Sequence, residues 1–414
     1  MANNKEKKVL NVPNSTDRRN VIRNVPHLRF PEFEGEWQKH KLCNIASIVG
    51  RIGFRGYTTN DIVAKGKGAI ALSPTNIENN RLTYDKDNTY ISFYKFEESP
   101  EIMIKQGDVV FVKTGSTVGK VAYVDKLMCK TTLNPQLVVL KNIQCDNYLL
   151  SVLMSTSRFQ NAIRKITVGG AVPTLSQAAM GDIAVTMPQV AEQEKLSKFI
   201  SLLDKRIATQ NKIIEDLKKL KSAIIEKLYS KIQGKEYSYG QLFEVINERN
   251  KQMEYSNILA ASQEKGMVNR NDLNLDIQFE RSNIDIYKIV RKGDYVIHLR
   301  SFQGGFAFSN MTGVCSPAYT ILRPSTLLEY GYLSYYFKSY RFIKSLIIVT
   351  YGIRDGRSIS VEEWLNLKIS IPSKEHQLHI LKVLRSFDLK IENEETYASC
   401  LSNQKQYLLR QMFI

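Results

Sequence analysis

Apolar residues recur at alternating spacings of four and three along residues 188–233, which is the seam pattern of a coiled coil. The seam positions are Leu196, Ile200, Leu203, Ile207, Gln210, Ile214, Leu217, Lys221, Ile224 and Leu228. Pro188 suits the first turn of a helix, Gly234 suits a helix stop, and no other proline or glycine lies between them. The pattern predicts one long helix, whose apolar stripe needs a partner to cover it.

The same seam returns 184 residues later, within residues 372–414. Its positions are Ile380, Leu384, Phe387, Ile391, Glu394, Ala398, Leu401, Lys405, Leu408 and Met412. The polar interruptions also coincide. Gln210 matches Glu394, and Lys221 matches Lys405. Two unrelated amphipathic helices would share their interruptions only by chance, so we interpret the stretches as an internal repeat. A duplicated unit favours pseudo-twofold symmetry, in which the two helices pair antiparallel.

The two seam lysines are expected to set specificity rather than stability. A lysine at a seam position costs stability but fixes the register and the partner of the helix. We therefore expect leucine at both Lys221 and Lys405 to raise the melting temperature and to permit misregistered or self-associated forms.

The segment before the first long helix has a mixed pattern. Short runs typical of strands, bounded by glycine, proline and asparagine turns, occur at residues 69–72, 108–112, 120–124 and 136–140. Residues 147–165 have the apolar spacing of a helix, and residues 167–176 read as a glycine-rich loop. The fold class predicted is mixed α/β.

Residues 235–371 repeat this plan. The sequence KQGD at 105–108 returns as RKGD at 291–294, and the loop at 350–360 takes the place of 167–176. The frameworks agree while the loop tips differ. The predicted organisation is a mobile tail at 1–25, a globular domain at 26–187, a long helix at 188–234, a second globular domain at 235–371 and a distal helix at 372–414.

The amino-acid composition indicates which kinds of partner and which compartment suit the protein. The formal net charge of +17 suggests a polyanion, with nucleic acid the leading candidate, although a generically basic, solvated surface is the alternative. The five cysteines are scattered and form no C-x-x-C motif, which fits a reducing cytoplasm and argues against disulfides. No apolar run is long enough for a membrane span, and the first residues do not resemble a signal peptide.

Motifs for catalysis are incomplete. The sequence GSTVGK at 115–120 has three residues between its glycines where a phosphate-binding loop needs four, so we predict a hairpin turn. The sequence NPQ at 134–136 lacks the second proline and the aromatic residue of amino-methylating enzymes. His376 and His379 have no third metal ligand nearby in sequence. We therefore expect no catalytic residue, no bound cofactor and no metal.

The chain resembles the specificity subunit of type I restriction-modification systems. The resemblance covers about residues 26–414 and rests on LRFPEFEGEW at 28–37, the K-x-G-D strands, the M-P and I-P junctions at 187–188 and 371–372, and the Q-x10-D-x2-I helix starts. It implies two target-recognition domains that each read half of a bipartite double-stranded DNA target. It also implies helices that act as spacer and docking surface for two methyltransferase subunits, which carry the S-adenosylmethionine chemistry, and two restriction-translocase subunits.

DNA contacts are expected from basic and polar side chains on loops. The candidates in the first domain are Lys113, Thr114, Ser116, Thr117, Lys120, Arg164, Lys165 and Thr167. Those in the second are His298, Arg300, Ser301, Gln303, Arg354 and Arg357. A solvated loop residue is the alternative for each of them. The alternative functions are a coiled-coil scaffold without DNA specificity and a stand-alone DNA-modifying enzyme.

Overall fold

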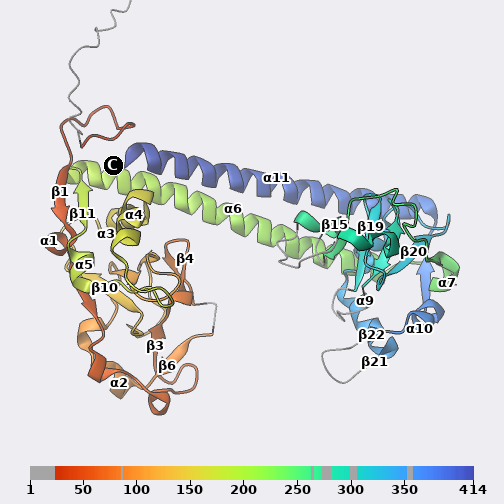
Figure 1. Ribbon diagram of the computed structural model, residues 1–414, viewed down its shortest axis with the longest axis horizontal. Coiled ribbons are helices and arrows are strands. Elements are labelled where there is room, and N and C mark those ends of the chain that lie inside the picture. The colour runs from red at the N-terminus through yellow and green to blue at the C-terminus, as the bar shows by residue number, and fades with distance from the viewer. Residues whose placement is uncertain (1–23, 85–86, 263–264, 273–280, 299–304, 352–357) are drawn as a thin grey trace, which may run out of the picture. The chain divides into compact units, whose positions relative to one another are not determined.

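The computed structural model describes residues 24–84, 87–262, 265–272, 281–298, 305–351 and 358–414. The predicted mobile tail therefore lies outside the described residues, except for its last two positions. The chain forms two compact units, Met1–Ile207 with Cys400–Ile414 and Ala208–Ser399. Each unit is mixed α/β, as predicted, and each takes part of both long helices (Figure 1).

The first unit contains a six-stranded sheet in which the buried strand β7 lies near the middle. The order is β2 (Ser47–Gly50), β10 (Leu137–Lys141), β7 (Val109–Val112), β8 (Val121–Tyr123), β5 (Arg81–Leu82) and β4 (Ile77–Glu78). A second sheet has the order β6 (Thr89–Ile91), β3 (Ala69–Leu72) and β9 (Thr131–Leu133). Strands β3, β7, β8 and β10 confirm the runs predicted from sequence. Strand β7 is buried at all its positions, which explains its unbroken apolar sequence.

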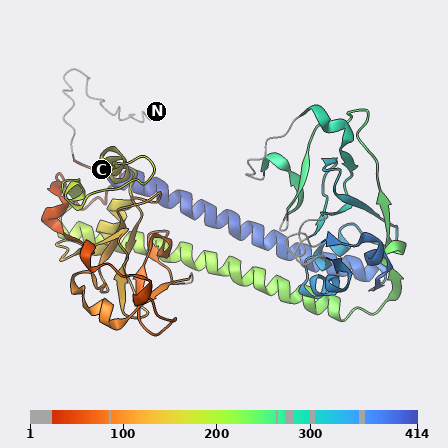
Figure 2. The same cartoon turned by 60° about the horizontal axis from the view of Figure 1, so that its bottom comes forward.

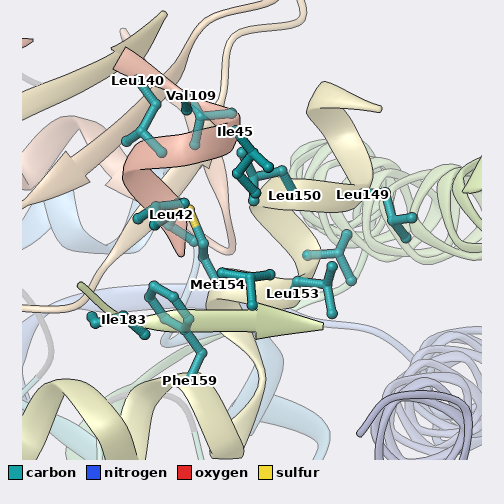
Figure 3. Close-up of a cluster of buried hydrophobic side chains, with 14 of the residues drawn as sticks. Leu42, Ile45, Val109, Leu140, Leu149, Leu150, Leu153, Met154, Phe159 and Ile183 are labelled. Carbon is teal, nitrogen blue, oxygen red and sulfur yellow. The ribbon is translucent and has the colours of Figure 1, made fainter. Parts of the chain in front are cut away.

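Helices α3 (Asn147–Ser155) and α4 (Ser157–Ile166) contribute to the core beside this sheet (Figure 3). Leu149, Leu150 and Met154 of α3 are fully buried there. The single helix predicted for 147–165 was wrong at one residue. Thr156 is extended (φ −66°, ψ 152°) and its hydroxyl donates to the Leu153 carbonyl at 2.7 Å, so the backbone breaks while the apolar spacing continues on both sides.

The second unit repeats the strand order. Its four-stranded sheet has the order β13 (Phe243–Ile246), β20 (Thr320–Pro324), β17 (Tyr295–Ile297) and β18 (Phe306–Phe308), antiparallel throughout. Further pairs are β14 (Leu259–Ser262) with β15 (Gly266–Asn269) and β16 (Lys288–Val290) with β19 (Gly313–Cys315). Helices α8 (Tyr332–Tyr336) and α9 (Tyr340–Ser345) take the places of α3 and α4.

Several smaller elements also occur once in each unit. Strand β1 (Gln38–Lys41) pairs with β11 (Ala184–Met187), as β12 (Lys235–Ser238) pairs with β23 (Lys368–Ile371). The short helices α1 (Leu42–Ile45) and α5 (Gln177–Gly181) correspond to α7 (Tyr239–Leu242) and α10 (Val361–Asn366). The internal repeat predicted from sequence is therefore confirmed for four strands of the main sheet, the β1–β11 and β12–β23 pairs and the helices named here.

The KQGD and RKGD sequences form the same turn. The Lys105 amide donates to Asp108 Oδ2 at 2.8 Å, and the Arg291 amide donates to Asp294 Oδ2 at 2.9 Å. The glycine between them has a positive φ in both copies, +93° and +99°, which a side chain would oppose. The repeat thus extends to single hydrogen bonds.

The predicted long helices are α6 (Val190–Ser230) and α11 (Lys374–Met412). All twenty predicted seam positions are buried or half-buried, which confirms the seam. In each unit one end of α6 lies beside the opposite end of α11 (Figures 1 and 2). Leu196 and Ile200 share a core with Met412 in the first unit, and Ile225 shares one with Ile380 in the second. The pairing within each unit is therefore antiparallel, as predicted.

The seam lysines have acidic partners. In the first unit Lys405 Nζ lies 2.5 Å from Asp204 Oδ1, while the Tyr148 hydroxyl donates to Asp204 Oδ2 at 2.6 Å. The second unit repeats this with Lys221 and Tyr335 on Asp388. These ion pairs argue against the expectation that leucine at both lysine positions stabilises the protein, because each aspartate would lose its lysine partner.

Other seam and junction contacts are also built twice. Gln193 Nε2 donates to the Pro188 carbonyl at 2.9 Å, and its Oε1 accepts from the Asp146 amide at 2.9 Å. Gln377 makes the equivalent bonds to the Pro372 carbonyl and the Glu329 amide, at 3.1 and 2.8 Å. These glutamines attach the first turn of each long helix, α6 or α11, to the globular part of its unit.

The segment LRFPEFEGEW packs against the start of α6 in the first unit. Arg29 donates from Nε and Nη2 to the two carboxylate oxygens of buried Glu192, at 2.8 and 2.6 Å. The Trp37 ring nitrogen donates to Glu192 at 3.3 Å, and Phe30 meets Phe199 edge-on. The hydrogen bond to Glu192 raises the pKa of Arg29. This segment thus holds the start of α6 in the first unit.

We predict that Lys405→Met destabilises the protein. The side chains of Lys405 and Asp204 are 17% and 15% exposed, so removing the lysine leaves a partly buried carboxylate, at a cost of about 2–3 kcal/mol. Chemical denaturation measures the loss. Adding Asp204→Asn to Lys405→Met should restore part of it. Lys219→Met removes an exposed lysine of α6 that pairs with Glu215, and should leave stability nearly unchanged. A stabilised Lys405→Met variant would contradict the pairing.

Candidate nucleic-acid interface

Three loops meet in the first unit beyond the ends of β7 and β10. The Leu175 amide donates to the Lys113 carbonyl at 2.8 Å, and the Gly115 amide donates to the Pro173 carbonyl at 2.9 Å. The Gln136 carbonyl accepts from the Lys113 amide at 2.9 Å. Residues 113–120, 134–136 and 167–175 therefore form one surface, which we call the first loop surface.

Six of the eight predicted residues of the first domain lie on this surface, and the other two, Arg164 and Lys165, lie in the last turn of α4, just before residues 167–175. Ser116, Lys120, Arg164 and Lys165 are exposed, and Lys113, Thr114, Thr117 and Thr167 are half-buried. Within the part of the chain that the structure describes, no carboxylate pairs with Lys120, Arg164 or Lys165. Their charges are thus available to an anionic ligand.

Thr167 also stabilises the end of helix α4. Its hydroxyl donates to the Ile163 carbonyl at 2.8 Å, and its amide donates to the same oxygen at 2.9 Å. This closes the last turn of α4 and directs the chain into the loop. Whether Thr167 also contacts DNA stays a prediction.

The sequence GSTVGK is a hairpin turn, as predicted. It joins the antiparallel strands β7 and β8. Gly119 has φ +99°, and Gln160 of α4 donates from Nε2 to its carbonyl at 2.8 Å and to the Met154 carbonyl at 2.7 Å. The Gln160 side chain therefore joins the hairpin turn to the end of helix α3.

Sequence reasoning missed two parts of this region. Gln136 is exposed between the other two loops. The sequence did mark this position, because the preceding residue, Pro135, is matched by Pro317 in the second copy of the repeat. Arg51 is buried and donates to the Leu133 carbonyl at 3.0 and 2.8 Å, which ties residues 51–57 to the strand next to Gln136. Burial lowers the pKa of Arg51. Its neighbour Phe54 is 84% exposed, and no spacing in the sequence marks it.

The second unit places its loops on the same framework. The His298 amide donates to the Gly305 carbonyl at 2.8 Å, where the loop leaves β17 and returns to β18. The His298 ring lies 6.0 Å from the Tyr319 ring. Strands β21 (Thr350–Tyr351) and β22 (Ser358–Ile359) enclose the other loop. Arg300, Ser301, Gln303, Arg354 and Arg357 lie outside the described residues.

The described residues contain no group of three histidine, cysteine or carboxylate side chains placed to hold a metal ion. Burial raises the pKa of both Cys145 and Cys315 to about 12, so neither thiol is activated as a nucleophile. Among the helices that the structure describes, none has the length and apolarity to cross a bilayer.

The family sequence model described as the type I restriction modification DNA specificity domain matches twice, at residues 34–219 and 233–399. The chain belongs to this family. The two matches coincide with the two copies of the repeat. Specificity subunits recognise DNA and do not catalyse the reaction, so the predicted role of a non-catalytic DNA-recognition subunit is confirmed by the family.

Two curated relatives come from Methanocaldococcus jannaschii. The chain is similar to the type I restriction enzyme MjaVIII specificity subunit, with 28% identity over 148 residues. That match covers 36% of this chain and only 34% of the relative. The putative type I restriction enzyme MjaX specificity subunit is 21% identical over 386 residues, which covers 87% of this chain and 89% of the relative.

Solved structures share the fold of this specificity subunit. The S subunit of a type I restriction-modification system from M. genitalium gives a TM-score of 0.51 at 14% identity, covering 94% of this chain and 99% of that one. A chain from a study of complex assembly and conformational transition of the type I R-M system gives 0.55 at 15% identity, covering 91% and 97%.

We predict that Gln160→Ala loosens the hairpin turn of the first loop surface. The variant loses the amide that joins the Gly119 and Met154 carbonyls, which should destabilise the protein by about 1–2 kcal/mol. Hydrogen exchange of residues 113–120 should become faster. Asn161→Ala, at the exposed next position of α4, is the matched control and should change neither measurement. Unchanged exchange in Gln160→Ala would show that the strands alone hold the turn.

Proposed function

We propose that each globular domain reads one half of a bipartite double-stranded DNA target. The observation that carries the proposal is a framework that is built twice and whose loop sequences differ between the two copies. The order of four strands, the KQGD and RKGD turns and the helix junctions agree between the units, while the loop sequences differ. Of GSTVGK only Gly119 is matched, by Gly305. Matching frames with divergent loops suit a protein that reads two different half-sites.

The residues of the first loop surface, and those of the adjoining last turn of α4, fall into two chemical groups. The unpaired cations of Lys120, Arg164 and Lys165 suit phosphate oxygens, which give affinity and register. Ser116 and Gln136 are exposed and carry hydrogen-bonding groups of the kind that read base edges in the major groove. The net charge of +17 supports a polyanionic ligand.

The outer faces of the long helices would dock the other subunits of the complex. Ile213 and Tyr397, which are 184 positions apart and therefore matched in the repeat, are 41% and 39% exposed. Apolar residues at matched positions suit two copies of one partner. We infer that two methyltransferase subunits bind there and supply the S-adenosylmethionine chemistry, that two restriction-translocase subunits complete the complex, and that it works in the cytoplasm.

The long helices would also set the distance between the half-sites. Helix α6 has 41 residues, and its first part belongs to the first unit and its second part to the second unit. At about 1.5 Å per residue it is about 60 Å long. A helix of fixed length would allow only a narrow range of spacers between the half-sites.

Exchange of residues 235–371 tests the assignment. The segment is replaced by that of a relative with a different second half-site, and methylome sequencing of cells that carry the variant and its methyltransferase gives the target. We expect one half-site to change and the other to remain, because no residue of the first loop surface is touched. A change in both half-sites would show that the domains are not independent readers, and loss of all sequence preference would favour a scaffold.

Lys120→Ala and Arg164→Ala test the phosphate contacts. In the complex with methyltransferase, each should weaken DNA binding similarly across sequences. Each should also reduce the slope of log affinity against log salt by about one. Lys219→Ala, on the long helix, should leave the slope unchanged. An unaltered slope in both loop variants would remove these residues from the interface.

A further inference from the structure

Two large aliphatic side chains lie exposed at the entrance to a loop of the second domain. Ile347 and Ile348 are 58% and 69% exposed. They belong to the 3-10 turn η7 (Leu346–Val349), directly before β21. Neither contributes to the apolar cores of the second unit. Burial therefore gives no reason for two adjacent isoleucines at this place.

The repeat identifies what these residues replace. Thr167 donates its hydroxyl to the Ile163 carbonyl at 2.8 Å, and Thr350 donates its hydroxyl to the Leu346 carbonyl at 2.6 Å. Ile163 and Leu346 are both buried, as are Phe159 and Phe342 four residues before them. Counting from these shared positions, Ile347 stands where the first domain has Arg164, and Ile348 stands where it has Lys165.

The isoleucine pair lies next to the point where strands β21 and β22 begin and end. The Ser360 amide donates to the carbonyl of Val349, the residue after Ile348, at 2.9 Å, and this bond closes the base of the loop. Arg341 and Lys344 are exposed on the preceding helix α9. Along the chain, the apolar pair is therefore preceded by two exposed cations and followed by the base of a loop. Exposed cations beside a recognition loop suit the phosphates of DNA.

We propose that Ile347 and Ile348 contact the 5-methyl groups of thymines in the half-site read by the second domain. The inference rests on the proposed function. In the major groove the thymine methyl is the apolar feature of a base edge, and aliphatic side chains recognise it by contact. Arginine and lysine at the matched positions suit phosphates or guanine instead. The same turn thus presents charged side chains to DNA in one domain and apolar side chains in the other.

The probe is the bipartite duplex found by methylome sequencing, bound to the complex with methyltransferase. Deoxyuridine replaces thymine throughout the second half-site, which removes only methyl groups. We expect affinity to fall about fourfold for each methyl group in contact, the change that one buried carbon gives. In Ile347→Ala with Ile348→Ala, the ratio of thymine to uracil affinity should approach one. Deoxyuridine in the first half-site is the matched control, and both proteins should respond to it equally.

A second variant keeps the inference testable if alanine disturbs folding. Ile347→Arg with Ile348→Lys installs the pair that the first domain carries on the same turn, so the backbone should accept it. It should fold with an unchanged melting temperature and lose the preference for thymine. The inference is overturned if the second half-site contains no thymine, if the wild-type complex does not distinguish uracil, or if the alanine variant fails to assemble with methyltransferase. Absence of any bipartite motif would instead overturn the proposed function.

Discussion

Asp204 and Asp388 are the points on which the framework of each unit depends. Each carboxylate accepts a hydrogen bond from a tyrosine of the globular part, Tyr148 or Tyr335, and pairs with a lysine of the other long helix. Burial, together with the bond to the aspartate, raises the pKa of both tyrosine hydroxyls, so they remain donors. One acidic side chain thus fixes the helix register and the attachment of the globular part at once.

The pairing is reciprocal, which explains why the repeat kept both polar interruptions. The lysine of the second repeat serves the aspartate of the first, and the reverse holds for Lys221 and Asp388. Gln210 donates to Glu394, and these two residues occupy the same position in the two copies of the repeat. Loss of one partner leaves a partly buried charge in the other copy, whereas an apolar seam would tolerate a shifted register. Register is therefore specified by polar contacts and stabilised by apolar ones.

Sequence patterns predicted the seam, the repeat and the hairpin at GSTVGK because each depends on local spacing. They could not predict which lysine meets which aspartate, because that requires the register between two helices 184 residues apart. The break at Thr156 was hidden by apolar spacing that continues through it. Gln136 joined the first loop surface through its backbone carbonyl, a group that every residue has. Five of the predicted contacts in the second domain lie outside the described residues, so they stay predictions.

The loops can differ between the units because backbone groups hold them. In the first unit the Leu175 and Gly115 amides bond to the carbonyls of Lys113 and Pro173, and in the second the His298 amide bonds to Gly305. None of these bonds depends on the identity of a loop side chain. Substitution at a tip therefore leaves no buried polar group unpaired, and the cost that restrains change in a core does not arise. Recognition can diverge on this framework while the tyrosine, aspartate and lysine contacts that carry stability remain the same.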